Sequence, residues 1–104
     1  ASFDTLGQGA ATAVDASGTE AFVVSFNGDS TALDMIRSGK SFKATAGNDL
    51  EGTGALACEL FAKLLAGETP EATTFWMDSP LVTDKNVPAS GFATGPGSFT
   101  LFGN

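Results

Sequence analysis

Apolar and polar positions along the chain predict strands and helices in alternation. The apolar run at 21–26 and the shorter run at 42–47 have the length of strands, and a helical spacing of apolar residues follows each of them. We expect these helices at about 31–38 and 50–66. Because the order is strand, helix, strand, helix, the two strands are expected to run parallel in an α/β fold.

A further helix is expected near the start of the chain. Thr5 and Gln8 have the spacing of a capping box, in which the two side chains bond reciprocally to the first turn. Alanines continue the helical pattern up to Gly18. Glycine favours a helix end because it adopts the left-handed conformation without strain.

The apolar residues also predict which surfaces are buried. The strand at 21–26 is apolar on both sides, which is typical of a strand buried on both faces. Leu33 and Ile36 are expected on the inner face of the short helix. The longer helix is expected to have one apolar face and, opposite it, an ion pair between Glu59 and Lys63. The apolar face comprises Leu56, Ala57, Leu60, Phe61, Leu64 and Leu65.

The character of the chain changes after position 72. Extended structure is expected on both sides of Pro80, and no helix is expected in the tail at 88–104, which is rich in Gly, Ser and Pro. This tail carries Phe92, Phe99 and Phe102. The pattern therefore predicts one small α/β domain at 1–87, followed by the tail.

Composition excludes several classes of function. The net charge of −7 over 104 residues lacks the clustered Lys and Arg of a nucleic-acid surface. The absence of histidine excludes His-dependent catalytic triads and most transition-metal sites, and Cys58, the single cysteine, has no internal disulfide partner. No apolar run approaches a membrane span of about 18 residues. We expect no metal, no cofactor and no enzyme activity.

Two amide side chains follow the two predicted strands directly. Asn27 comes after the first strand and Asn48 after the second. Ligands of open α/β sheets bind outside the carboxyl ends of the strands, and these ends meet at one edge when the strands are parallel. The sequence therefore predicts a binding site that includes both asparagines.

Several short motifs, taken in their order and spacing, resemble a known family. They lie in VVSFNGDSTALDMIRSGKSFKATAGNDLEGTGALACELFAKLLAGE and in the later PLVTDKNV. This sequence resembles the C-terminal lobe of type I periplasmic sugar-binding proteins of ABC transporters, of the ribose, galactose and xylose kinds. Members commonly carry a V-V-G-F-D-G turn, an A-T-x-A-Q segment, a helix ending LLxGE and a P-L-V-T-x-x-N-V segment. The resemblance covers about Phe3 to Val87.

The resemblance implies a fold and a function. The fold would be part of a doubly wound parallel sheet, the last portion of the second of two lobes. The function would be non-covalent binding of a neutral monosaccharide or polyol in the cleft between the lobes, with delivery to an ABC permease. The location would be periplasmic or otherwise extracytoplasmic, and a cell-surface lipoprotein fits as well.

The resemblance also implies which residues contact the ligand. Asn27 takes the place of the aspartate of the family's F-D-G turn, and Asn48 that of the Gln or Asn that closes the second strand. Phe3 stands where many members have an Asn, and its ring could stack on a sugar or only pack against the protein. Asp4, which follows Phe3, is also expected to contact the ligand. Replacement of Asp by Asn at position 27 removes a charge-assisted acceptor.

Other interpretations of these residues remain open. Asn27 and Asn48 could serve only as turn formers, and Asp4, Asp29 and Asp49 each precede a helix that they could cap. Cys58 is expected to be a buried, inert thiol. The glycines near position 52 lack the Gly-Lys-Ser/Thr ending of a phosphate loop. The alternative function is the effector domain of a sugar-responsive repressor of the LacI type, and a flavodoxin-like fragment would show the same order of elements.

Self-association is expected for the chain alone. In the fold that it resembles, the strand at 22–26 would pair with a strand that is missing here, which leaves an apolar strand edge open. Open edges pair with other chains. We therefore expect a dimer that forms at this edge, with weak sugar binding or none.

Overall fold

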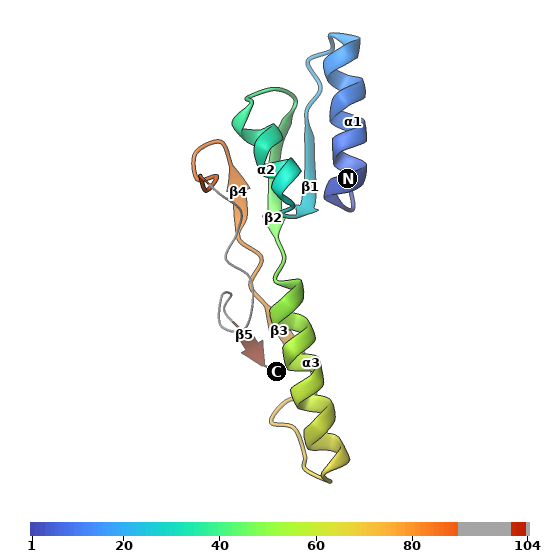
Figure 1. The fold of residues 1–104 in the computed structure, drawn as a ribbon, viewed down its shortest axis with the longest axis vertical. Helices are drawn as coiled ribbons and strands as arrows, with labels where there is room; N and C mark the ends of the chain where they lie inside the picture. Colours follow the sequence, from blue (N-terminus) through green and yellow to red (C-terminus); the bar gives the residue numbers. More distant parts are fainter. Residues whose placement is uncertain (90–100, 104) are drawn as a thin grey trace. The chain divides into compact units, whose positions relative to one another are not determined.

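The computed structural model describes residues 1–89 and the backbone of residues 101–103. It divides into two compact units (Figure 1). Of the described residues, the first unit holds Ala1–Asn48 and 80–89, and the second holds Asp49–Ser79 with the last strand.

The first unit contains a three-stranded mixed sheet in the order β1-β2-β4. Strand β1 (Val23–Asn27) pairs in parallel with β2 (Phe42–Gly47), as predicted, and β4 (Leu81–Thr83) pairs antiparallel with β2. Helix α2 (Ser30–Arg37) connects the two parallel strands. The carboxyl ends of β1 and β2 therefore lie at the same edge of the sheet, with Asn27 in register with Gly47.

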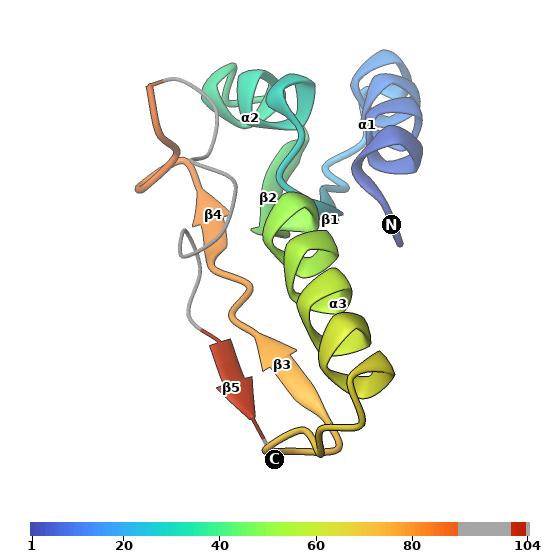
Figure 2. The same ribbon diagram turned by 60° about the horizontal axis from the view of Figure 1, so that its bottom comes forward.

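The core of this unit lies on one face of the sheet. Helices α1 (Asp4–Ser17) and α2 lie on the same side of β1 and β2 (Figure 2). Their apolar residues join those of the strands in a single cluster, and Leu33 and Ile36 are buried in it as predicted. The cluster comprises Ala11, Val23, Ala32, Leu33, Ile36, Phe42 and Val82.

The prediction that the first strand is buried on both faces is wrong. Val23 is buried, but Val24 is 48% exposed and Phe22, just before the strand, is 67% exposed. Both helices of this unit cover the same face, so the side chains that alternate to the other face stay in contact with solvent. Strand β1 is also at the edge of its sheet, where the N-terminal ammonium group of Ala1 donates a hydrogen bond to the carbonyl of Val24 at 2.6 Å.

The predicted capping box at the start of α1 is also wrong. Phe3 occupies the N-cap position and makes no side-chain capping bond, so Thr5 lies inside the first turn, where it cannot act as the cap. The helix begins at Asp4 because the carboxylate of that residue is held by distant partners, described below. The helix end is as predicted, with Gly18 in the left-handed conformation at a φ of 66°.

The second unit is built on α3 (Leu50–Leu65), with β3 (Phe75–Met77) paired antiparallel to β5 (Leu101–Gly103). The Asp49 side chain caps α3 by accepting a hydrogen bond from the backbone N–H of Gly52 at 2.8 Å, as predicted. The predicted pair of Glu59 and Lys63 is present at 2.7 Å. Gly67 has a φ of 79° just after the helix.

The apolar face of α3 is only partly covered. Leu56 and Leu60 are half-buried, whereas Phe61, Leu64 and Leu65 are 63%, 56% and 74% exposed. Cys58 is exposed as well, so the prediction of a buried thiol is wrong. A helical period in the sequence indicates that a face is apolar, but it does not indicate what covers that face.

The architecture is thus mixed α/β, and the sheet of the first unit contains one parallel strand pair. Phe92 and Phe99 of the predicted tail lie outside the described residues. Phe102 lies in β5, in register with Trp76 of β3. Among the helices that the structure describes, none combines the length and the apolar character needed to cross a membrane.

Candidate functional site

The two predicted asparagines meet at the carboxyl ends of β1 and β2. The side-chain amide of Asn48 donates to the side-chain oxygen of Asn27 at 3.4 Å, and the backbone N–H of Asn48 donates to the carbonyl of Asn27 at 3.0 Å. Both residues are partly exposed. The parallel pairing therefore places two amide groups side by side where a ligand can reach them.

Asn27 has an unusual backbone conformation. Among the described residues, it is the only non-glycine residue with a positive φ, which is 133°. Such conformations are costly for residues with a Cβ atom, by about 1–3 kcal/mol, and they cluster at functional sites. The surrounding structure must therefore hold this turn in place.

The carboxylate of Asp4 anchors this turn. It is fully buried, and one carboxylate oxygen accepts from the backbone N–H of Asp29 at 2.7 Å. Its other oxygen accepts from the Thr45 hydroxyl at 2.7 Å, and the Thr45 oxygen in turn accepts from the backbone N–H of Gly28 at 3.2 Å. The Gly28–Asp29 segment after Asn27 is thus anchored to α1 and to β2.

Asp29 occupies the N-cap position of α2, but its side chain makes no capping bond, contrary to the prediction. Burial raises the pKa of the Asp29 carboxyl above its ordinary value, and the nearby Asp4 carboxylate raises it further. The folded state therefore holds the Asp29 proton more tightly than the unfolded state does. Its contribution to stability is largest at low pH and is lost as the pH rises through the raised pKa.

The structure thus brings together three of the four residues predicted to contact a ligand. Asn27 and Asn48 touch each other, and Asp4 anchors the turn that follows Asn27. Phe3 precedes Asp4 and is 53% exposed, so its ring is available to a ligand. Both oxygens of Asp4 bond within the protein, which gives this residue a positioning role at the site.

Sequence reasoning missed Thr45. It is fully buried and links Asp4 to Gly28. One signal was present, because Thr45 is the only hydroxyl residue within the β2 sequence FKATAG. A hydroxyl in a strand of small apolar residues needs a hydrogen-bond partner when it is buried.

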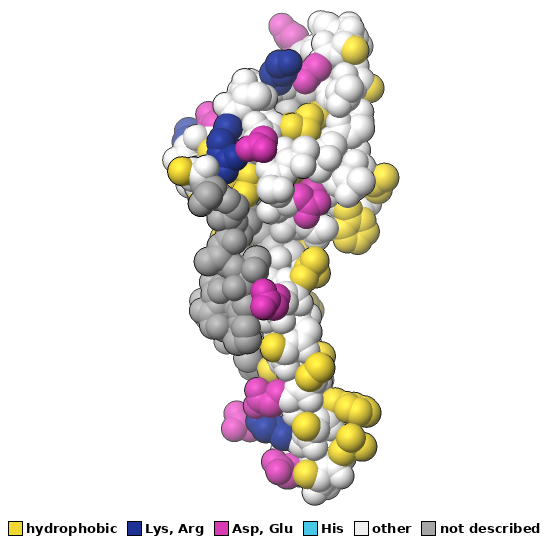
Figure 3. All heavy atoms as spheres, viewed as in Figure 1, with side chains coloured by type: hydrophobic (Ala, Val, Ile, Leu, Met, Phe, Trp, Pro, Cys, Tyr) yellow, Lys and Arg dark blue, Asp and Glu magenta, His cyan; other side chains and the backbone are white. Residues whose placement is uncertain are grey.

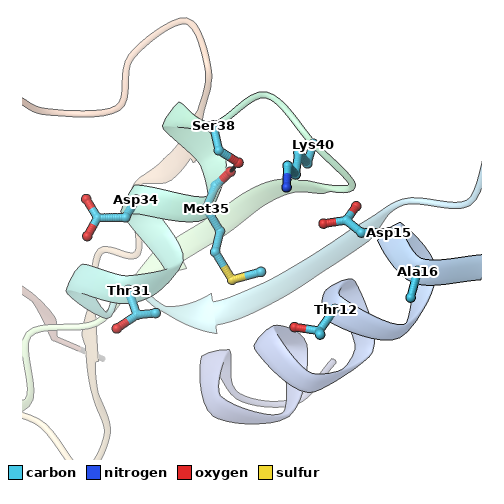
Figure 4. Close-up of a pocket in the computed structure, with 8 residues that line it drawn as sticks. All are labelled: Thr12, Asp15, Ala16, Thr31, Asp34, Met35, Ser38 and Lys40. Atoms are coloured by element: carbon cyan, nitrogen blue, oxygen red, sulfur yellow. Dashed lines mark hydrogen bonds between the residues drawn. The ribbon is translucent and has the colours of Figure 1, made fainter.

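A hollow lies between α1 and α2, with a volume of about 570 Å³ (Figure 4). Several of its polar side chains bond to neighbouring residues. Asp34 pairs with Arg37, Asp15 accepts from the backbone N–H of Ser41, and Thr12 donates to the carbonyl of Gln8 on its own helix. None of the residues that line this hollow was predicted to contact a ligand.

The two amides are suited to hydrogen bonding with a neutral ligand. A side-chain amide both donates and accepts hydrogen bonds, as does a sugar hydroxyl, and it carries no charge. Within the described residues, His, Cys, Asp and Glu side chains form no group of three that could hold a metal ion.

The positive φ of Asn27 leads to a testable prediction about stability. Replacing Asn27 by glycine should raise the free energy of unfolding by about 1 kcal/mol, because glycine adopts positive φ without a Cβ clash. Replacing Asn27 by alanine should lower it by about 1 kcal/mol, since alanine keeps the Cβ clash and tolerates positive φ less well than asparagine. Both variants lose the side-chain bond to Asn48, which is long at 3.4 Å and contributes little. Urea denaturation followed by circular dichroism measures both. An alanine variant more stable than the glycine variant would contradict the interpretation of strain.

Comparison with known proteins assigns no family. A scan against models of protein families finds no match, and a search of curated proteins finds no significant one.

Proposed function

We propose that this chain binds a neutral monosaccharide or polyol, as part of an extracytoplasmic receptor that delivers sugar to an ABC permease. The observation that carries the proposal is the pair of amides, Asn27 and Asn48, at the carboxyl ends of two parallel strands. The motifs that resemble type I sugar-binding proteins support it.

The geometry of the pair fits this ligand class. The side-chain bond from Asn48 to Asn27 is long, at 3.4 Å, so its replacement by bonds to a ligand costs little. Two adjacent amides present both donors and acceptors, which the hydroxyls of a sugar ring can pair with. The exposed ring of Phe3, beside Asp4 at the start of α1, is suited to contact the apolar face of such a ring.

The proposal also includes a larger fold of which this chain is a part. We infer that the parallel pair β1–β2 is part of a larger doubly wound sheet, whose second lobe supplies the remaining ligand contacts. The position of β1 at the edge of its sheet is compatible with a further strand there. One lobe then supplies only part of the hydrogen-bond set, so the chain alone binds sugar weakly.

Titration of the chain with pentoses, hexoses and polyols tests this proposal. One class of sugar should shift the NMR signals of the side-chain amides of Asn27 and Asn48 together, with a Kd on the order of millimolar. Replacing Asn48 by alanine should abolish the shift at Asn27. Gln8, whose amide lies on α1, provides the matched control, and Gln8→Ala should leave the titration unchanged.

Two results would count against the proposal. If no sugar in the panel shifts the NMR signal of either side-chain amide, the two asparagines serve only as turn formers. If the chain alone binds with micromolar affinity, the inferred second lobe is not needed for binding.

A further inference from the structure

Helix α3 carries an exposed apolar stripe along its length. With 100° between successive residues, one side of the helix presents Leu50, Gly54, Ala57, Cys58, Phe61, Leu64 and Leu65. All seven are exposed, Leu50 by 64% and Phe61 by 63%. Figure 3 shows hydrophobic side chains in a row along this helix. We call these seven residues the α3 stripe.

The α3 stripe carries no charge. The ion pair between Glu59 and Lys63 lies on another side of the helix. Glu51 borders the α3 stripe but is not part of it. For a chain with a net charge of −7, a face without carboxylates of its own is the place where two copies meet with the least repulsion. Contiguous exposed apolar surface of this kind marks interaction sites.

The α3 stripe is also complementary to itself. The helix has 16 residues, so its midpoint falls between Ala57 and Cys58. Rotation by 180° about an axis through this midpoint places Phe61 opposite Gly54, and Leu50 opposite Leu65. Phe61 then faces a residue without a side chain, whereas Leu50 and Leu65 face each other as two apolar side chains. A Cβ at Gly54 would meet nothing within 4 Å in the single chain, so the space that Phe61 would enter is open.

We propose that α3 pairs antiparallel with α3 of a second copy of this chain, with Phe61 of each copy packed over Gly54 of the other. A two-fold interface uses the same patch on both copies, and the match of Phe61 with Gly54, made twice by the two-fold axis, meets that requirement. The small residues at the centre let the two helices approach to the 8–10 Å typical of packed helices. The proposal uses a surface distinct from the edge of β1 and does not depend on sugar binding.

Analytical ultracentrifugation tests the proposal. The chain should sediment as a dimer at about 10–100 µM, and Phe61→Glu should weaken association by about tenfold or more, because it removes the central aromatic contact and places two carboxylates at the interface. Glutamate forms helices at least as well as phenylalanine, so α3 itself should persist. Ala55→Glu adds the same charge to α3 away from the α3 stripe and should leave the dimer intact.

Gly54→Leu provides a second variant. It fills the space that Phe61 needs, so it should weaken the dimer although it introduces no charge.

The position of the contact can also be measured. Cys58 is the only cysteine and lies at the centre of the proposed interface, so spin labels on it should show a short distance within the dimer. A chain that stays monomeric at about 100 µM overturns the proposal. A dimer that tolerates Phe61→Glu but dissociates with Val24→Lys also overturns it, and places the contact at the edge of β1 instead.

Discussion

Replacement of Asp4 by alanine should lower the free energy of unfolding of the first unit by about 3 kcal/mol. The change removes two charge-assisted hydrogen bonds at once, one to the backbone N–H of Asp29 and one to the hydroxyl of Thr45. Thr45 is fully buried, so its hydroxyl cannot turn to water instead. Leaving buried polar groups without partners is among the most costly effects of a single substitution.

Amide hydrogen exchange measures this loss of stability at the turn that Asp4 anchors. Exchange at Asp29 should accelerate more than at any position in α3, because Asp29 loses its acceptor directly whereas α3 belongs to the other unit. Tryptophan fluorescence is less informative, since Trp76 also lies in the second unit. Unchanged protection at Asp29 would show that the Asp4 carboxylate is not what anchors the turn.

Asp4→Asn is the matched control. Asparagine has the same shape, and its oxygen can accept from the backbone N–H of Asp29, but its amide then faces the Thr45 hydroxyl, which loses its acceptor. Stability should therefore fall, but by less than with Asp4→Ala. The pKa of Asp29 should nevertheless fall, because the neighbouring negative charge is gone. A carboxyl titration by NMR should show this fall, and the loss of stability with rising pH should become smaller.

Replacing Gly7 by alanine should also destabilise the first unit, by about 1–2 kcal/mol. A Cβ at this position would lie 2.9 Å from Cε2 of Phe42 and 3.0 Å from Cβ of Ser25. Phe42 is buried and cannot move aside, so α1 must shift away from the sheet. Overpacking of this kind costs about 1–3 kcal/mol, which outweighs the gain of up to about 1 kcal/mol from replacing glycine in a helix.

Gly9 of the same helix provides the control. A Cβ there would meet nothing within 4 Å, so Gly9→Ala should stabilise the protein by about 0.5–1 kcal/mol through helix propensity alone. Thermal unfolding of the two variants should therefore shift in opposite directions. Equal shifts would mean that α1 does not pack closely on β1 and β2 at Gly7.

Local sequence patterns were sufficient to predict most of the described helices and strands. The helical spacing of Leu33 and Ile36 predicted the buried side of α2, and β2 runs over the predicted residues. Such periods arise from the geometry of each element, so a short window contains the whole signal. The parallel pairing of β1 and β2 followed from the order of the elements, and with it the meeting of Asn27 and Asn48.

Predictions from the sequence failed where residues far away in the chain determine a local feature. The start of α1 could not be predicted from the capping-box spacing, because Asp4 bonds to Asp29 and Thr45, which are 25 and 41 residues away. Asn-Gly indicated a turn, but the positive φ of Asn27 itself depends on that same anchoring. No local pattern contains these pairings.

Burial was decided by the tertiary structure in the same way. The sequence by itself determined that the first strand and α3 have apolar sides, since that is a property of residue type and spacing. Only the tertiary structure decided that α1 and α2 cover the same face of the sheet and leave Val24 exposed, and that the α3 stripe stays in contact with solvent. The reason is physical: a side chain's type and position determine its affinity for an apolar surface, but its burial requires a second surface that packing alone brings to it.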